Sequence, residues 1–220
     1  MRTPFSPWKS IGRQLAHPRG ITGRFVGQAM AQVNRHPNRL AIDALKIGPA
    51  DTVLELGFGP GRATRTLTSM VPRGQVFGIG QSAAMLGQAS RHNKRAILSG
   101  RVQLQQGHFD SLPWGAETVD KILAVNVVYF FRSDAGEIHE AGRVLRPGGK
   151  IAIYATDKST MAGWRVCTPE THRTFDRNDL MAFILSGGFT HEEVSVRSVA
   201  LAFNISGLLA ICQKGIESHL

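Results

Sequence analysis

Glycines at every second position give one short stretch of the chain the means to hold a ligand. Gly57, Gly59 and Gly61 follow an apolar run, 53–56, in which Glu55 is the single charged residue. Glycine lets the backbone turn sharply and approach another molecule closely. Backbone amides at such a turn bind polar or anionic groups when a helix begins directly after it. The stretch therefore predicts a binding platform.

The elements on either side of the glycines place this platform at the edge of a sheet. Val53, Leu54 and Leu56 are typical of a parallel strand that is covered on both faces. After the turn, apolar residues recur at helical spacing, at Ala63, Leu67, Met70 and Val71. A strand, a glycine turn and a helix N-terminus in this order predict a ligand site at the carboxyl end of a sheet.

The rest of the chain alternates between strand and helix patterns. Further strands are predicted at 75–79, 102–106, 119–125 and 150–155. Helices are predicted from Ser82 to Ile97, from Ser133 to Leu145, and from Asp176 to Gly187. Residues 194–199 and 205–212 are expected to form an antiparallel hairpin. Short connections between strands and helices favour a mainly parallel α/β sheet.

The N-terminal segment differs from the rest in its pattern. A helix from Gly23 is expected to end at Pro37, and Asn38 is expected to cap a second helix. We therefore predict a basic helical arm or cap over residues 1–47, which packs over the carboxyl edge of the sheet, and one domain over residues 48–220.

Positive charge is concentrated at this end of the chain. The formal net charge is +10, and seven basic residues precede the first acidic one, Asp43. Residues 1–40 could thus contact an anionic membrane surface, a nucleic acid or an acidic substrate. A solvated basic face without a partner fits the same pattern, so both interpretations stay open.

Composition narrows the class of protein. A chain of 220 residues with 42% hydrophobic residues suits one globular domain. No apolar run approaches the ~20 residues that span a bilayer, and residues 1–9 lack a signal-peptide core. Cys167 and Cys212 form no metal-binding motif, so we expect no metal site and reduced thiols. These features predict a cytoplasmic protein, with contact to a membrane surface as an open alternative.

Several segments, in order, resemble class I S-adenosylmethionine-dependent methyltransferases. The pattern Glu55-x-Gly57-x-Gly59-x-Gly61 resembles motif I of that family, and the matching segments are 53–61, 77–86, 112–114, 119–129 and 143–149. The resemblance covers roughly residues 40–215. It implies a three-layer α-β-α Rossmann-like sandwich with a seven-stranded, mostly parallel sheet, one antiparallel strand and an N-terminal helical cap. It also implies S-adenosylmethionine bound across the ends of the first, second and fourth strands.

This resemblance assigns candidate cofactor contacts. The amides of the glycine turn would face the methionine part of the cofactor, and Glu55 would bind its ammonium group unless it caps amides of the loop itself. The candidate cofactor-binding residues are Glu55, Gly57, Phe58, Gly59, Gly61, Gly80, Gln81, Ser82, His108, Phe109, Asp110 and Asn126.

Two positions depart from the family pattern. Gly80 stands near the position of an acidic residue that binds the ribose, and Gln81 is the candidate substitute. His108 stands where the family often has an aspartate for the adenine amino group, so Phe109 or Asp110 would have to serve. These departures predict weaker cofactor binding or a different ligand.

Candidate catalytic residues are Asn126, Tyr129 and His108. Asn126 and Tyr129 have the spacing of the N-P-P-Y motif of amino-group methyltransferases, which they resemble without its prolines. His108 would be a base if it faced the acceptor. A strand-end turn for Asn126, core packing for Tyr129 and a surface position for His108 are the structural alternatives.

The predicted activity is methyl transfer from S-adenosylmethionine to a small or lipid-like acceptor by direct in-line displacement. The segment 157–175 contains aromatic and apolar residues suited to an acceptor pocket, namely Met161, Trp164, His172 and Phe175. The alternatives are a phospholipid or nucleic-acid methyltransferase that docks through the basic arm, and a catalytically inactive binding protein of the same fold. We expect no dedicated nucleic-acid module, and the acceptor and oligomeric state stay open.

Overall fold

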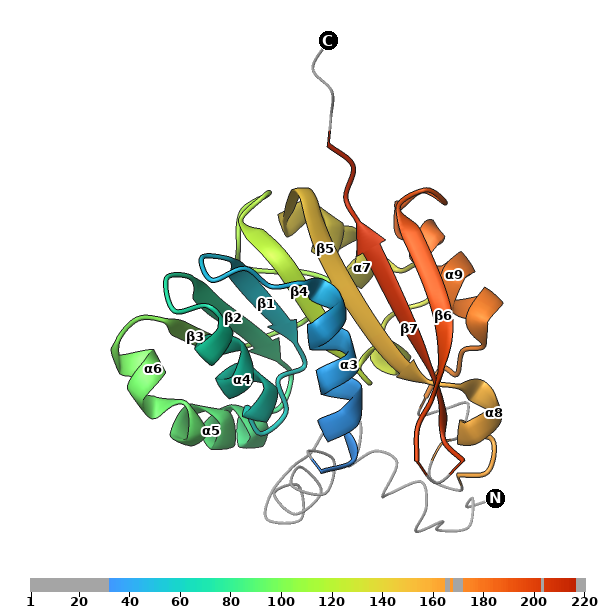
Figure 1. Ribbon diagram of the computed structural model, residues 1–220, viewed down its shortest axis with the longest axis horizontal. Helices are drawn as coiled ribbons and strands as arrows, with labels where there is room; N and C mark the ends of the chain where they lie inside the picture. Colours follow the sequence, from blue (N-terminus) through green and yellow to red (C-terminus); the bar gives the residue numbers. More distant parts are fainter. Residues whose placement is uncertain (1–31, 165–166, 168–171, 203, 217–220) are drawn as a thin grey trace, which may run out of the picture.

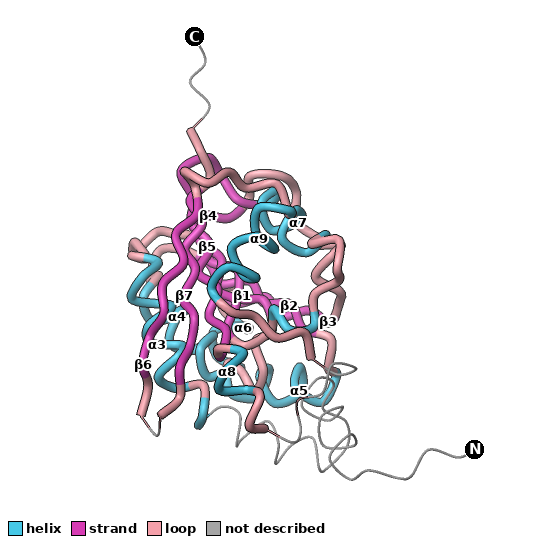
Figure 2. Tube along the Cα trace, turned by 90° about the vertical axis from the view of Figure 1, so that its right-hand side faces the viewer, coloured by secondary structure: helices cyan, strands magenta, loops and turns pink. Residues whose placement is uncertain are grey.

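The fold is built on a single twisted sheet with helices on both faces (Figures 1 and 2). A computed structural model describes residues 32–164, 167, 172–202 and 204–216 of the chain. Its seven strands lie in the order β3-β2-β1-β4-β5-β7-β6. Helices α3 and α4 cover one face, and α7 and α9 cover the other. The predicted three-layer, Rossmann-like α/β architecture is confirmed.

The strand assignment follows the sequence closely. Every pair of neighbours is parallel except those that include β7, which runs antiparallel to β5 and β6, as predicted. The strands are β1 Thr52–Leu56, β2 Gln75–Gly80, β3 Val102–Gln106, β4 Val119–Val125, β5 Leu145–Thr156, β6 Val194–Ala200 and β7 Ser206–Gln213.

The helices agree less fully with the prediction. They are α3 Arg35–Leu45, α4 Arg62–Met70, α5 Ala83–His92, α6 Lys94–Leu98, α7 Gly136–Val144, α8 Lys158–Met161 and α9 Arg177–Ser186, with a short 3₁₀ turn η1 Val128–Phe130. Two of the three predicted caps are present: Ser82 accepts a hydrogen bond from the Met85 amide, and Asp176 forms a capping box with Asp179.

Two helix predictions were wrong at a boundary. The helix expected to run from Ser82 to Ile97 ends at His92, because the next residue, Asn93, leaves helical geometry and binds the carbonyls of Gly61 and Ala89. The helix expected to begin at Ser133 begins at Gly136 instead, directly after Ala135, which has a left-handed φ of 53°.

Pro37 does not end a helix, contrary to the prediction. It is the third residue of α3, which begins at Arg35 and continues to Leu45. The first amides of an α-helix have no acceptor inside the helix, so a residue without an N–H group fits the first turn. Asn38 consequently lies within α3, whereas residues 1–31 of the predicted arm lie outside the described part of the chain.

Helix α3 belongs to the core of the sheet structure. Its residues Ala41, Ile42 and Leu45 are at most 5% exposed and pack in one cluster with residues of β1, β4 and β5. Figure 1 shows α3 lying across the middle of the sheet with its N-terminal end toward the lower edge. The division at residues 47 and 48 stays a prediction. Within the described residues, no helix is long and apolar enough to cross a membrane.

Candidate functional site

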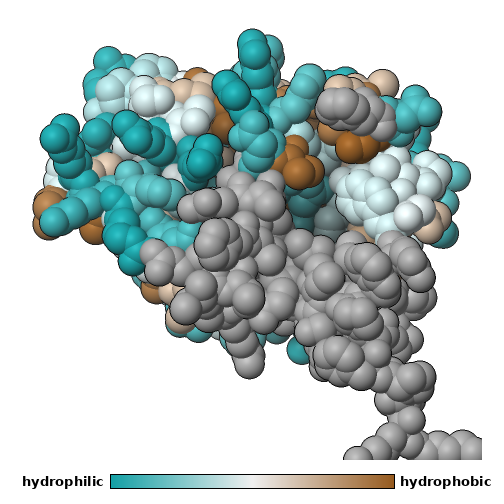
Figure 3. Space-filling model, turned by 90° about the horizontal axis from the view of Figure 1, so that it is seen from below, coloured by the Kyte–Doolittle hydropathy of each residue, from teal (hydrophilic) through white to brown (hydrophobic). Residues whose placement is uncertain are grey.

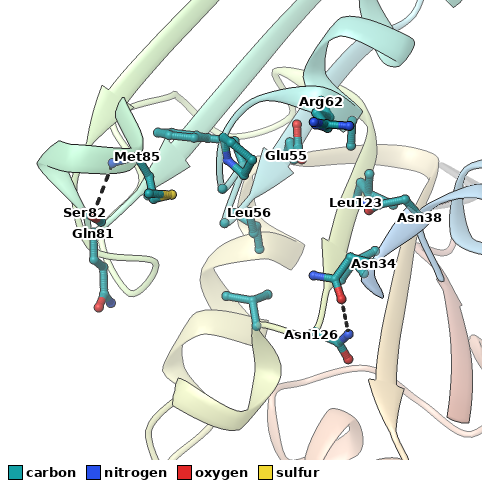
Figure 4. A pocket seen from close by; sticks show the side chains of 18 of the residues that line it. Asn34, Asn38, Glu55, Leu56, Arg62, Gln81, Ser82, Met85, Leu123 and Asn126 are labelled. Atoms are coloured by element: carbon teal, nitrogen blue, oxygen red, sulfur yellow. Dashed lines mark hydrogen bonds between the residues drawn. The ribbon is translucent and has the colours of Figure 1, made fainter. Parts of the chain in front are cut away.

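A pocket lies where β1, β2 and β4 end, at the edge of the sheet that the glycine turn was predicted to occupy (Figure 4). It holds about 990 Å³ of empty space, part of it open to solvent. Its walls come from the ends of these strands and from the first turns of α3, α4 and α5. The lining residues are Asn34, Asn38, Glu55, Leu56, Gly57, Phe58, Gly59, Pro60, Arg62, Ala63, Gly80, Gln81, Ser82, Met85, Phe109, Leu123, Val125, Asn126, Val127 and Phe130.

The glycine turn leaves two backbone amides free. Gly57, Gly59 and Gly61 all have positive φ, at 77°, 48° and 82°. The Gly57 amide was predicted to face the ligand. It donates instead to the Ile79 carbonyl at 2.8 Å, a bond between two strands of the sheet. Among the described residues, the amides of Phe58 and Gly59 have no acceptor. A Cβ on Gly59 would meet nothing within 4 Å, so this side of the turn is open.

Helix α5 fixes the shape of the turn from behind. His92 Nδ1 lies 2.7 Å from the Pro60 carbonyl oxygen, and Asn93 Nδ2 donates to the Gly61 carbonyl at 3.0 Å. A Cβ on Gly61 would lie 2.7 Å from the Cα of Ala89, closer than van der Waals contact allows. The third glycine of the motif therefore serves helix packing rather than ligand contact.

Glu55 is the one carboxylate among the described residues that line the pocket. Its side chain is 4% exposed and accepts a hydrogen bond of 2.6 Å from the Thr64 hydroxyl. Burial raises the pKa of Glu55 to about 7, against the smaller opposing effect of the Thr64 hydrogen bond. No loop amide donates to it in the described part of the chain, which disfavours the capping alternative. A buried carboxylate of this kind is suited to a cationic group.

Asn126 stands at the centre of a side-chain network on the opposite wall. It has a left-handed φ of 53° directly after β4, and its Nδ2 donates to Asn34 Oδ1 at 2.7 Å (Figure 4). Its Oδ1 accepts from the Tyr129 hydroxyl at 2.7 Å and from the Thr156 amide at 3.2 Å. The Tyr129 oxygen in turn accepts a hydrogen bond from the Thr156 amide. The network joins α3, β4 and β5 around one amide.

Tyr129 holds this network from outside the pocket. It is 7% exposed and is not among the lining residues, and burial raises its pKa above the ordinary value. Of the N-x-x-Y pair, only Asn126 lines the pocket. Tyr129 is therefore a positioning residue in this geometry.

Two predicted candidates lie away from the pocket. His108 and Asp110 are exposed and absent from its lining, whereas the intervening Phe109 is buried and contributes to it. Asp110 lies 3.7 Å from Arg132 instead. Gly80, Gln81 and Ser82 do line the pocket, and their contact with the cofactor stays a prediction.

The Phe58 ring accounts for the missing side chain at Gly80. A Cβ on Gly80 would lie 3.1 Å from the Cζ atom of Phe58, and one on Gly78 would lie 3.0 Å from its Cδ1 atom. Phe58 is 3% exposed and packs with Met85 and Ala89. The ring covers the end of β2 and leaves little room for a side chain at position 80, where the family pattern has an acidic residue.

The predicted acceptor segment, 157–175, contributes none of the described lining residues. Met161 and Phe175 are buried in the core, and Trp164 is 37% exposed. His172 is 6% exposed beside the rings of Tyr129 and Phe130, and burial lowers its pKa. Parts of the segment, 165–166 and 168–171, lie outside the described residues.

Three polar residues that line the pocket were not among the predicted site residues. Asn34 and Asn38 come from the first turn of α3, and Arg62 comes from the first residue of α4. Asn38 was interpreted as a helix cap because Pro37 precedes it. A search for polar residues in first turns of helices at the carboxyl edge would have found all three.

Comparison with known proteins identifies the family. Residues 53–149 match the family described as "Methyltransferase domain". The uncharacterized methyltransferase YdaC of Bacillus subtilis is 30% identical over 186 residues, which cover 84% of this chain and 94% of that relative. The chain belongs to the S-adenosylmethionine-dependent methyltransferase family.

Two further matches are less similar in sequence. The sterol 24-C-methyltransferase of Kluyveromyces lactis is 29% identical over 138 residues, 61% of this chain but only 37% of that protein. A solved S-adenosylmethionine-dependent methyltransferase from Aquifex aeolicus superposes with a TM-score of 0.66 at 19% identity, covering 95% of this chain and 100% of that one. The last comparison supports the fold alone.

The pocket of this methyltransferase fits S-adenosylmethionine. The cofactor carries an ammonium and a carboxylate, and the pocket offers the Glu55 carboxylate together with the free amides of Phe58 and Gly59. The family and the donor set therefore agree on the predicted cofactor.

Proposed function

We propose that this methyltransferase acts on a small or lipid-like acceptor with an apolar body and one polar atom near Asn126. The observation that carries the proposal is the character of the wall beyond the glycine turn. That wall is apolar except for Asn38 and for the paired amides of Asn34 and Asn126 (Figure 4). Its apolar members are Leu123, Val125, Val127, Phe109 and Phe130.

The residues that line the pocket are suited to align the acceptor with the methyl group of the cofactor rather than to transfer a proton. Bound S-adenosylmethionine supplies a methyl group already activated on a sulfonium centre. Transfer by in-line displacement then depends mainly on the alignment of the acceptor with that methyl. Glu55 and Arg62 are the only lining residues of the described chain that carry charge, and Glu55 is suited to the cofactor ammonium. These facts favour an acceptor atom that is nucleophilic without a protein base.

The names of relatives agree with a small acceptor without fixing its identity. Proteins about 29% identical to this chain are named for erythromycin and for a sterol. A phospholipid or a nucleic acid, docked through residues 1–40, is the alternative acceptor. Residues 1–31 of this segment lie outside the described part of the chain, so this contact stays a prediction.

Mass spectrometry with trideuteromethyl-labelled S-adenosylmethionine tests the proposal. The purified enzyme is incubated with a panel of isoprenoid phenols, sterols and aromatic acids, and in parallel with phospholipid vesicles and RNA. We expect the label in an apolar small molecule. An Asn126→Ala variant serves as the control, because it should lower turnover while cofactor binding is retained. Label found only in RNA or phospholipid would contradict the proposal.

A further inference from the structure

Helices α4, α5 and α6 carry five exposed cations that have no anionic partner among the described residues. We name them the α4–α6 basic cluster: Arg62, Arg65, Arg91, Lys94 and Arg95. Their helices are held together at the glycine turn, where His92 and Asn93 bind the carbonyls of Pro60 and Gly61. None of the five forms an ion pair with any described residue.

The cluster is not an average charged surface of this protein. Residues 52–109 contain seven basic residues and a single acidic one, Glu55, which is buried in the pocket. Cations elsewhere in the fold are commonly paired. The pairs among the described residues are Arg39–Asp43, Arg132 with Asp110 and Asp134, Arg143–Glu140, Arg146–Asp120, Lys158–Asp179 and Lys214–Glu117. Five like charges without neutralisation repel one another and favour a polyanionic partner.

An apolar side chain stands beside these cations. Leu98, the last residue of α6, is 77% exposed and follows Lys94 and Arg95 on the same short helix. Cations that flank an exposed apolar side chain are typical of a surface that lies on a bilayer, with the cations at the headgroups. Helices α4, α5 and α6 carry no Phe, Tyr or Trp on which a nucleic-acid base would stack. The residue types therefore favour lipid over nucleic acid.

The cluster adjoins the mouth of the pocket. Arg62 belongs both to the cluster and to the lining, and the first turn of α5 contributes Ser82 and Met85 to the same lining. Figure 3 views this edge of the molecule, and hydrophilic side chains project from its left-hand side, where Figure 1 places α5 and α6. A bilayer that contacts the cluster would thus lie beside the entrance.

We propose that the α4–α6 basic cluster and Leu98 form a docking face for a bilayer that contains anionic phospholipid. These residues are different from residues 1–40, and the proposal goes beyond the proposed function because it holds whichever acceptor is methylated. Docking would concentrate the enzyme where lipid-like molecules reside.

Vesicle sedimentation of the full chain tests the docking face. Wild type is compared with Arg91→Gln/Lys94→Gln/Arg95→Gln on vesicles of phosphatidylcholine alone and with phosphatidylglycerol added. Three cations near an anionic surface contribute multiplicatively, so we expect partitioning to fall on the order of a hundredfold. The matched control, Lys121→Gln/Lys150→Gln/Arg197→Gln, removes the same charge from β4, β5 and β6 and is expected to bind like wild type. Circular dichroism and calorimetry with S-adenosylmethionine verify that fold and cofactor binding are kept.

A second variant separates lipid from nucleic acid. Leu98→Ser removes an exposed apolar side chain, so it should weaken vesicle binding several-fold and leave binding to a 20-nucleotide RNA unchanged. The proposal would be overturned if the cluster variant bound vesicles as well as the control and wild type do. Any binding would then belong to another region of the chain. Loss of RNA binding in the cluster variant with no change on vesicles would overturn it in favour of nucleic acid. Because cofactor affinity is measured separately, failure of the proposed function would be recognised independently.

Discussion

The two halves of the sheet build their sides of the pocket by different means. In residues 52–109, the pocket is made largely of backbone: two free amides, three glycines with positive φ, and a helix packed against the turn. In residues 110–216, it is made of side chains, with Asn126 held by Tyr129 and Thr156. The charges differ in the same way, since cations are unpaired in the first half and commonly paired in the second.

This difference teaches which part of the site tolerates change. A backbone platform depends on conformation, so a single added methyl group can destroy it. A side-chain network depends on hydrogen bonds, and one missing partner costs less. Substitutions in the two halves should therefore differ in size and in kind.

The largest effect is expected for Gly61→Ala. The added Cβ would lie 2.7 Å from the Ala89 Cα, and the residue would keep a φ of 82°. We expect a loss of about 2–4 kcal/mol in the free energy of unfolding and cofactor binding weaker by on the order of a hundredfold. Thermal denaturation and calorimetry measure both.

Gly59→Ala and Gly115→Ala are the matched comparisons. Gly59 has open space around its Cβ position, so its variant should lose only ~1 kcal/mol from positive φ while cofactor affinity falls as the open side is filled. Gly115 lies in the second half and should change stability by less than about 0.5 kcal/mol. Equal stability of the Gly61 and Gly59 variants would refute the packing role of α5.

Glu55 makes cofactor binding depend on pH. Its pKa is raised to about 7 in the free protein, so a cationic ligand must first bind the minority carboxylate form at lower pH. We expect affinity for S-adenosylmethionine to rise as pH increases from 5.5 to 8, and binding near pH 6.5 to release protons. Glu55→Gln should lose about 2 kcal/mol of binding and become insensitive to pH. Calorimetry in buffers of different ionisation enthalpy checks the proton release.

The same raised pKa fixes the sign of the stability change without cofactor. A folded-state pKa above the unfolded value near 4.5 means that folding favours the protonated form. The free energy of unfolding should therefore decrease as pH rises from about 4.5 through about 7. Relative to wild type, Glu55→Gln should gain stability across this window, and a variant less stable than wild type at pH 8 would contradict the burial argument.

Tyr129→Phe should moderately lower stability and turnover without changing the cofactor contacts of residues 52–109. It removes the hydroxyl that donates to Asn126 and accepts from the Thr156 amide. We expect a loss of about 1–2 kcal/mol in stability and a several-fold lower kcat, with the Kd of S-adenosylmethionine unchanged. A fall in kcat of more than about a thousandfold, with an altered pH profile, would instead make Tyr129 a catalytic base.

The smallest effects are expected at the positions where the sequence departs from the family. Gly80→Asp places its Cβ against the Phe58 ring, so it should weaken cofactor binding by ~1 kcal/mol rather than restore a ribose contact. Adding Phe58→Ala should relieve the contact, and titration of both variants checks this. His108→Ala should change turnover by less than about twofold, because His108 is exposed outside the pocket.

The first half of the site could be predicted from sequence because its elements are consecutive. Gly57 to Gly61 follow their own strand directly, and Ser82 follows the next one, so spacing alone places them at one edge. The sequence could not show that the Gly57 amide is used within the sheet, since that bond joins two strands. It also gave no sign that Phe58 covers Gly80.

The second half was less predictable because its contacts join distant segments. Asn34 and Asn126 are 92 residues apart and meet only because α3 packs across β4 and β5. Pro37 was wrongly predicted to end a helix, because a residue without an N–H group fits the first turn of α3. Exposure separates His108 from Phe109, and local spacing carries little information about exposure at the end of an edge strand.

The bond between Asn34 and Asn126 joins the wall beyond the glycine turn to a helix that precedes the first strand in the chain. The glycine turn and the Asn34 side of the pocket are thus encoded in separate stretches of the sequence. Exchange of the α3 segment between relatives would alter the wall that faces the acceptor and leave the glycine turn intact. Such modularity would let one scaffold acquire new acceptors without reinventing its methyl donor site.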